Sequence, residues 1–224
     1  MFVCAVVPVK TLRDSKRRLS AVLNPHERRL LAVAMLEDVL AALKKSEVQE
    51  TVVVSNDSVI HEVADKHGVV YLEAGQSGLN SAIEEATNWC VQNGADAVLV
   101  LPADIPFVSS RDINKMTKLG AEETSVVLSP SQDDGTNAML LNPPNSIKMC
   151  FGPRSFARHI KEARSRKVEV KFYYSAEIAL DIDSVEDLKQ LYKAEKDALS
   201  KRVLRQIAER SEKARSFLAA EPSA

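Results

Sequence analysis

The sequence predicts a three-layer α/β sandwich, in which a mostly parallel, Rossmann-like sheet lies between two layers of helices. Short apolar runs rich in Val, Ile and Leu alternate along the chain with segments whose apolar residues recur at helical spacing. Parallel strands are joined by crossovers that usually contain a helix, so this alternation is typical of a parallel sheet covered on both faces. A chain of 224 residues is long enough for one such domain to bury a large core without disulfides or metal.

The first strand and helix are the clearest elements. Residues 2–7 are apolar and of β type, and residues 10–20 form a polar loop. The next helix begins after Asn24, which can cap it, with Pro25 in the first turn and Glu27 completing a capping box. The apolar face of this helix is formed by Leu36, Val39, Leu40 and Leu43, which recur at helical spacing.

The later elements follow from the same two periodicities. Strands are predicted at residues 51–55, 69–72, 98–101, 125–129, 138–141 and 169–173, and helices at 59–67, 80–92, 110–119 and 153–166. Pro153 suits the first position of its helix. The segment LDID, residues 180–183, is interpreted as a last strand-like piece, and Ser184 begins the helix after it.

The C-terminal part of the chain differs in composition. Residues 193–218 are rich in Lys, Glu, Arg and Ala with sparse apolar residues, which predicts one appended helix. We therefore divide the chain into a domain at 1–195 and a helical extension at 196–224. The extension either packs on the domain, joins a second subunit in a homodimer, or is solvated.

The charge balance and the cysteines of the chain limit which partners the protein can bind and where in the cell it is expected. The 30 basic and 31 acidic residues leave a formal net charge of −1, which gives no overall field for nucleic acid or an anionic membrane. The cysteines, three in number, form no CxxC pair and cannot all be joined in disulfides. The apolar N-terminal run ends at Lys10, too soon for a membrane span, and lacks the basic start of a signal peptide. We expect a cytoplasmic protein with small-molecule partners and neither a nucleic-acid nor a membrane partner.

A basic loop follows the first strand. The stretch PVKTLRDSKRRLS carries Lys10, Lys16 and Arg18 but no glycine, so it is no Walker-type cradle. Its lysine side chains can bind a triphosphate through a compact ammonium charge, and its arginine side chains through the paired N–H groups of a planar guanidinium. A solvated basic loop is the alternative. Ligands of open α/β sheets collect at the carboxyl ends of the strands, which is where this loop lies.

Carboxylates occupy two other places at the same edge of the predicted sheet. Asp104 lies between two prolines in VLVLPADIPF, and Asp181 and Asp183 are two apart, so their side chains share a face. Gathered carboxylates repel one another unless a cation is present, and hard oxygen ligands near a triphosphate suit Mg²⁺. We expect these three residues to bind Mg²⁺. The alternatives are a turn aspartate at 104 and a helix-capping role for Asp183.

Seven motifs together indicate a family. They are PVKTLRDSKRRLS, SNDS, GLNSAI, LPADIPF, DDGTNAM, FGPRSFARH and LDIDSVEDL, and they span about residues 1–195. In this order they resemble the small guanylyltransferases that activate 2-phospho-L-lactate or phosphoenolpyruvate in the biosynthesis of the deazaflavin coenzyme F-420. One departure is Arg17, where many members have a small hydroxyl residue. The resemblance implies a nucleotide-diphospho-sugar transferase type of fold for residues 1–195.

The resemblance also implies the substrates and their sites. GTP would be held by Lys10, by Ser55 and Asn56 on one wall, and by Gly78, Leu79 and Asn80 on the other. From the residues alone, Ser55 and Asn56 equally fit an ordinary Asx turn, and Asn80 a helix cap. The small phosphorylated acid would lie at Thr136, Gly152 and Ser155, which match the acceptor positions of the family. Gly135 and Thr136 equally fit a turn into the next strand.

The reaction that follows is nucleotidyl transfer. An oxygen of the acceptor phosphate attacks the α-phosphorus of GTP, and pyrophosphate leaves. Catalysis is then positioning and charge neutralisation, with Lys16 and Arg18 on the triphosphate and Asp104 on the metal. Other hypotheses are a molybdopterin-type or sugar-type nucleotidyltransferase, many of which open with a glycine-rich loop, and a non-catalytic GTP-binding assembly module. The histidines, His159 among them, are assigned no chemistry.

Overall fold

The computed structural model of the protein describes residues 1–14, 16–75 and 78–219. Seven strands form one sheet in the order β3-β2-β1-β4-β6-β5-β7. The strands are β1 (Val3–Pro8), β2 (Glu50–Ser55), β3 (Val70–Glu73), β4 (Ala97–Val100), β5 (Ser125–Pro130), β6 (Thr136–Asn142) and β7 (Glu169–Phe172). Only the pairings of β6 with β4 and β5 are antiparallel in this sheet. The predicted mostly parallel sheet is confirmed.

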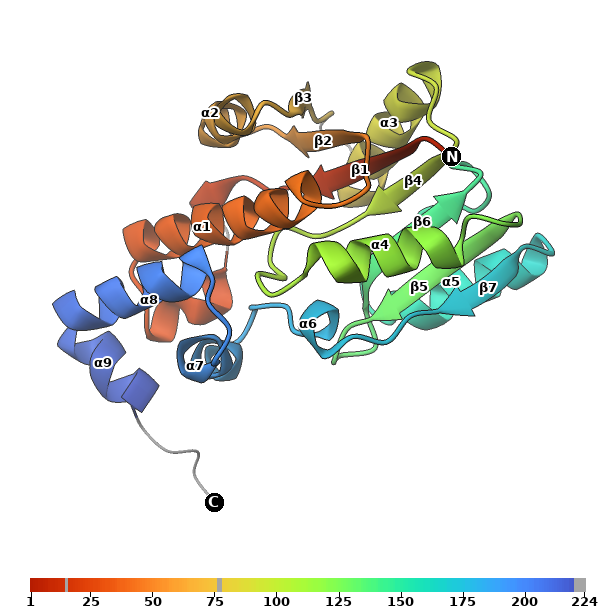
Figure 1. The fold of residues 1–224 in the computed structure, drawn as a ribbon. Coiled ribbons are helices and arrows are strands. Elements are labelled where there is room, and N and C mark those ends of the chain that lie inside the picture. The colour runs from red at the N-terminus through yellow and green to blue at the C-terminus, as the bar shows by residue number, and fades with distance from the viewer. Residues whose placement is uncertain (15, 76–77, 220–224) are drawn as a thin grey trace.

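Helices cover both faces of the sheet (Figure 1). They are α1 (Pro25–Lys44), α2 (Ser58–His67), α3 (Leu79–Gln92), α4 (Ser110–Leu119), α5 (Ser155–Ser165), α6 (Ala176–Ala179), α7 (Val185–Lys193), α8 (Leu199–Arg210) and α9 (Glu212–Ala219), with short 3₁₀ turns η1 (Leu12–Asp14) and η2 (Arg17–Ala21).

Alternate side chains of β1 build a core on each face of the sheet, as a period of two requires. Ala5 and Val7 belong to the apolar cluster that contains residues of α1, α2 and α4. Cys4 and Val6 belong to the cluster with residues of α3 and α5. The three layers therefore follow from the pattern of one strand.

The start of α1 is the capping box that the sequence predicts. The Asn24 side chain accepts a hydrogen bond from the Glu27 amide at 3.0 Å, and Glu27 accepts one from the Asn24 amide at 2.8 Å. Pro25 is the first helical residue. The chain can therefore turn into α1 directly after the basic loop.

Two elements near the candidate site differ from the predictions. The helix expected from residue 153 begins at Ser155, because Arg154 adopts a left-handed conformation with φ 52° and places Pro153 in the turn before the helix. Residues 180–183 are not a strand, since the short helix α6 precedes them and no strand pairs with them. Leu180 and Ile182 are nevertheless buried while Asp181 and Asp183 are partly exposed, so the predicted alternation holds without a sheet.

The C-terminal region forms two helices, so the prediction of one helix over residues 193–218 is wrong. The helical conformation is interrupted at Ser211, between α8 and α9. Both carboxylate oxygens of Asp38, on α1, accept amide hydrogen bonds at the start of α8, from Leu199 at 2.7 Å and Ser200 at 2.9 Å. In Figure 1 α8 runs beside α1.

A third apolar cluster joins η2, α1, α7, α8 and α9, and includes Leu19, Leu31, Leu188, Leu204 and Leu218. The extension packs on the domain, and its part in a homodimer stays a prediction. None of the described helices is long and apolar enough to cross a membrane.

Candidate active site

A cavity of about 650 Å³ opens at the carboxyl ends of β1, β2 and β4. Pro8, Val54 and Val100, at or next to the last residues of these strands, contribute to its wall. The predicted site residues that line the cavity are Lys10, Lys16, Asn56, Gly78, Leu79, Asp104, Thr136 and Asp183. Those that lie outside its wall are Arg18, Ser55, Asn80, Gly152, Ser155 and Asp181. Segments remote in the sequence therefore converge at the predicted edge of the sheet.

Lys16 joins two of the predicted carboxylates. Its Nζ lies 2.6 Å from Asp104 Oδ2 and 2.6 Å from Asp183 Oδ1, and its side chain is only 9% exposed. Lys16 has a left-handed backbone, φ 53°, in the turn before η2. Burial disfavours the ammonium, but the two carboxylates outweigh this effect and raise the pKa of Lys16. The lysine is therefore held as a cation.

The charge on Asp183 is stabilised from several sides. Burial raises the pKa of its carboxyl, and the opposing effect of Lys16, with smaller contributions from Arg18 and Lys10, leaves the pKa below its ordinary value. Arg18 is exposed and outside the cavity wall, and its charge helps to lower the pKa of Asp183. Three basic residues of the loop thus act on one carboxylate.

Asp181 is bound by Asn137, whereas Lys16 pairs with Asp104 and Asp183. The Asn137 side chain donates to Asp181 Oδ1 at 3.0 Å and to the backbone oxygen of Ile178 at 2.8 Å. Burial raises the pKa of Asp181, the Asn137 hydrogen bond opposes the shift, and the Asp104 and Asp183 carboxylates add to it. Asn137 on β6 therefore fixes the segment that carries both aspartates, because α6 and Asp181 are bound to one amide group.

The carboxylates can be tested for their fit to a divalent ion. Within residues 1–14, 16–75 and 78–219, no group of three acidic, histidine or cysteine side chains is arranged to hold a metal. Asp104 and Asp183 do share one cation, the Lys16 ammonium, and both present the hard oxygen donors that Mg²⁺ prefers. These two residues fit a divalent ion at the place of that ammonium. The site of three carboxylates stays a prediction.

On the nucleotide side, Gly78 is the residue before α3 and has φ 96°. A Cβ there would meet nothing within 4 Å, so glycine is favoured by the positive φ and not by a lack of space. Asn80 uses its amide on the backbone of Phe151: Nδ2 donates to the oxygen at 3.1 Å and Oδ1 accepts from the nitrogen at 2.8 Å. Asn80 therefore ties α3 to the loop before α5, and its contact with a nucleotide stays a prediction.

On the acceptor side, Ser155 Oγ accepts a hydrogen bond from the Thr136 amide at 2.9 Å. Ser155 is 2% exposed and lies behind Thr136, which reaches the cavity. Gly152 is exposed with φ 124°, a backbone conformation suited to glycine. Thr136 is thus the predicted acceptor residue that faces the cavity directly.

Comparison with known proteins decides the family. The family model described as "Guanylyl transferase CofC like" matches residues 3–218. A phosphoenolpyruvate guanylyltransferase of Rubrobacter xylanophilus is 41% identical over 85% of this chain and 94% of its own. The chain belongs to this family. A 2-phospho-L-lactate guanylyltransferase of Methanothermobacter thermautotrophicus is 37% identical over 85% of this chain and 84% of its own.

Membership of the CofC-like guanylyltransferases makes the protein a nucleotidyltransferase, as predicted. A crystal structure of a putative nucleotide-diphospho-sugar transferase from Desulfovibrio desulfuricans has a TM-score of 0.78, with 17% identity over 97% of this chain and 99% of that one. At that identity the likeness shows the fold alone, and it confirms the predicted fold type.

Besides Asn137, two residues near this CofC-like site are absent from the predictions. Asp57 accepts the Leu12 amide at 2.8 Å and the Val59 amide at 3.0 Å, so it fixes the loop after β1 to the start of α2. An aspartate directly before a helical pattern is the signal that indicates its capping role. His159 lies at the acceptor side, and no signal in the sequence distinguishes it from an ordinary helical histidine.

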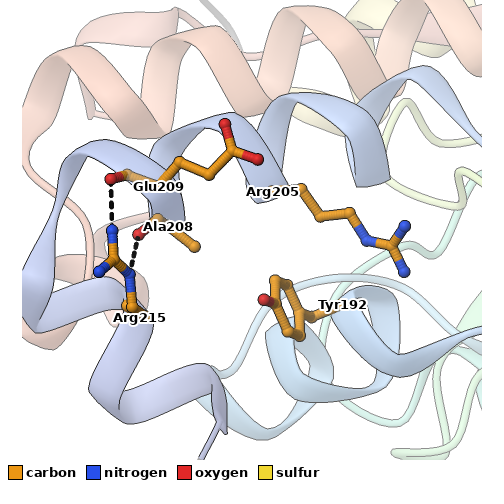
Figure 2. A pocket seen from close by; sticks show the side chains of 5 residues that line it. All are labelled: Tyr192, Arg205, Ala208, Glu209 and Arg215. Atoms are coloured by element: carbon orange, nitrogen blue, oxygen red, sulfur yellow. Dashed lines mark hydrogen bonds between the residues drawn. The ribbon is translucent and has the colours of Figure 1, made fainter.

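A second, shallow depression of about 270 Å³ lies on the C-terminal helices (Figure 2). Tyr192, Arg205, Ala208, Glu209 and Arg215 line it. Arg215 donates to the backbone oxygens of Ala208 at 3.2 Å and Glu209 at 2.5 Å, so its guanidinium caps the end of α8. The depression is therefore a helix-packing feature, separate from the site.

Proposed function

We propose that the protein transfers GMP from GTP to a small phosphorylated carboxylic acid, phosphoenolpyruvate or 2-phospho-L-lactate, and releases pyrophosphate. The observation that carries this proposal is the Lys16 ammonium between Asp104 and Asp183 in the wall of the cavity. The names of the two relatives support these acids as acceptors. The same motifs support a place in coenzyme F-420 biosynthesis.

The triphosphate is assigned to the basic loop after β1. Lys10 and Lys16 line the cavity, and the charges of Lys10 and Arg18 reach Asp183. Three cations suit the charge that develops on the leaving pyrophosphate. The guanosine is assigned to the opposite part of the cavity, between Asn56 and the start of α3 at Gly78 and Leu79.

Asp104 and Asp183, with Asp181 beside them, would hold Mg²⁺. When bound, the ion would neutralise triphosphate charge during transfer. Lys16 would then give up its two carboxylate partners and act on the triphosphate. The buried position of its ammonium between them keeps a positive charge at this point before the ion and the nucleotide arrive.

The acceptor phosphate is assigned to Thr136, with Ser155 and Gly152 behind and beside it. Thr136 and Asp104 line the same cavity, which supports an approach of the acceptor oxygen to the α-phosphorus from the Thr136 side. A phosphate is already an anion near neutral pH, so the step needs no general base. The protein contributes by positioning the two substrates and by supplying positive charge near their phosphates.

Cytoplasmic location and a homodimer are further parts of the proposal. The free thiols of the three cysteines support the first. Because α8 and α9 pack on the domain, we expect a dimer contact to use their outer surface. Light scattering of the purified protein tests whether a dimer forms.

The test of the function is mass spectrometry of the product. The protein is incubated with GTP, Mg²⁺ and an equimolar mixture of phosphoenolpyruvate, 2-phospho-L-lactate and 3-phosphoglycerate. We expect pyrophosphate and one dominant guanylylated acid, whose mass identifies the acceptor. Parallel reactions with ATP and CTP test the base. GTP binding without pyrophosphate release from any acid would support a non-catalytic module instead.

A further inference from the structure

His159 is fully buried on α5 behind the acceptor side of the cavity. Its two ring nitrogens contact different segments. Nε2 accepts a hydrogen bond from the Cys150 amide at 2.9 Å, and Nδ1 lies 3.0 Å from Thr136 Oγ1. The imidazole therefore connects the loop before α5 with the first residue of β6.

These contacts fix the protonation of the ring. A nitrogen that accepts a hydrogen bond from a backbone amide carries a lone pair and no proton. The imidazolium form is thereby excluded for this arrangement, and the proton of the neutral ring lies on Nδ1. Burial, with a smaller effect of the Arg158 charge, lowers the pKa of His159 to about 4, which agrees with a neutral ring.

The direction of the Nδ1 hydrogen bond then fixes the Thr136 hydroxyl. Nδ1–H donates to Thr136 Oγ1, and Ser155 Oγ donates to the same oxygen at 3.4 Å. Both partners of this oxygen in the described part of the chain are donors. Thr136 lines the cavity, so its own hydroxyl proton is left to point toward a ligand there.

We propose that His159 is a positioning residue for the acceptor, whose Nδ1–H holds the Thr136 hydroxyl as a hydrogen-bond donor toward an anionic oxygen of the phosphorylated acid. The inference rests on the proposed function, to which it adds His159 and the direction of the hydrogen bond from Thr136 to the acid. The ring also packs edge-on against Phe151, with centroids 4.9 Å apart, and Asn80 holds the backbone of the same residue. The loop that carries Gly152 is thus fixed from two sides.

Two substitutions separate the two contacts of the ring. His159→Gln places an amide oxygen near the position of Nε2, so it keeps an acceptor for the Cys150 amide and loses the donor to Thr136. His159→Asn places an amide nitrogen near the position of Nδ1, so it keeps the donor and leaves the Cys150 amide without a partner. We expect His159→Gln to raise KM for the acid roughly tenfold, the loss of about one oriented hydrogen bond, with KM for GTP within about twofold of wild type.

His159→Asn should leave KM for the acid within about threefold of wild type and lower the melting temperature more than His159→Gln does. Equal effects of the two variants on both KM values would reduce His159 to a structural residue and overturn the proposal. Thr136→Val should abolish the difference between the two His159 variants, whereas Thr136→Ser, which keeps the hydroxyl, should preserve it.

A second measurement does not depend on activity. Nitrogen NMR of ¹⁵N-histidine-labelled protein, with the His159→Gln spectrum assigning the resonance, should show Nδ1 protonated and Nε2 unprotonated at neutral pH. An imidazolium, or a proton on Nε2, would overturn the proposal whether or not the enzyme is active. Absence of any guanylylated acid with the correct tautomer present would instead count against the proposed function.

Discussion

The ammonium nitrogen of Lys16 lies 2.6 Å from the carboxylate of Asp104, although the two residues are 88 positions apart in the chain. The same nitrogen lies 2.6 Å from Asp183. Removal of a buried cation from between two carboxylates leaves them to repel each other, so its departure is favoured when another cation replaces it. Lys16 therefore keeps both carboxylates compensated in the absence of substrates.

Lys16→Met should lower kcat/KM by roughly 100-fold or more, because it removes a cation from the triphosphate side of the transition state. It should also raise the affinity for Mg²⁺ in the absence of nucleotide, since Asp104 and Asp183 lose their ammonium partner. Calorimetric titration with MgCl₂ measures the second effect. Lys118→Met is the matched control, because Lys118 is exposed and pairs with Glu47 at 3.3 Å on the surface. Unchanged Mg²⁺ affinity would separate Lys16 from the metal site.

Asp104→Asn should abolish transfer while leaving the fold intact. The backbone oxygen of Asp104 accepts the Ile182 amide at 3.0 Å, and this contact does not depend on the side chain. An amide of the same shape has lost the charge that pairs with Lys16, so we expect a fall in kcat of roughly 100-fold or more with a near-normal circular dichroism spectrum. Asp133→Asn, at an exposed turn residue, is the control. Normal turnover of Asp104→Asn at saturating Mg²⁺ would remove Asp104 from the site.

Ser155→Ala should raise KM for the phosphorylated acid more than KM for GTP. The substitution removes the acceptor of the Thr136 amide, which is then buried without a partner and free to shift. We expect an increase of roughly five- to tenfold in the acid KM, measured by pyrophosphate release with each substrate varied in turn. Ser165→Ala is the matched control on the same helix, because its hydroxyl bonds only the backbone of Glu162 among the described residues. An unchanged acid KM would place the acceptor elsewhere.

Local patterns predict the layers of this fold because they depend on neighbours in the sequence. The alternation along β1 separates Ala5 and Val7 from Cys4 and Val6, and the capping box at Asn24 sets the start of α1. The position of Asp104 follows from β4, because ligands of open α/β sheets collect where the parallel strands end. These features need no knowledge of distant contacts.

Several of the unpredicted features depend on contacts between distant segments. Asn80 acts on Phe151, 71 residues away, so its sequence neighbours indicate only a helix cap. The break of the C-terminal helix at Ser211 has no glycine or proline to mark it, and the position of α8 is set by Asp38, 161 residues earlier than Leu199. The left-handed backbone of Arg154 likewise has no local signal, since arginine rarely adopts it.

The depressed pKa of His159 gives the stability of the protein a dependence on pH. Its folded value of about 4 lies below the ordinary value of 6.5, so between these pH values the unfolded chain binds a proton that the folded chain does not. The contribution is fully present above pH 6.5 and is lost as the pH falls toward 4. It amounts to the order of 3 kcal/mol.

His159→Gln should therefore have a free energy of unfolding that changes less between pH 6.5 and 4 than that of wild type, as measured by urea unfolding at several pH values. His26→Gln, a substitution at an exposed residue, should retain the wild-type slope. Parallel pH profiles for wild type and His159→Gln would show that the ring is not buried as a neutral group.

The Asp38 carboxylate makes the C-terminal helices part of the domain. Burial raises its pKa, and its hydrogen bonds to Ser200 and Leu199 oppose the shift. Asp38→Ala leaves two amides at the start of α8 without an acceptor, so we expect a loss of about 1–2 kcal/mol in the free energy of unfolding. Asp38→Asn keeps one acceptor and should lose less.

Urea unfolding followed by circular dichroism measures both Asp38 variants. Asp65→Ala, at an exposed position of α2, is the control and should stay within about 0.5 kcal/mol of wild type. Because Leu204 and Leu218 share a buried cluster with Leu31 of α1, removal of residues 196–224 should expose this cluster and cost far more than Asp38→Ala. A truncated chain as stable as the full one would mean that α8 and α9 contribute nothing to the fold, and Asp38 could then not act through them.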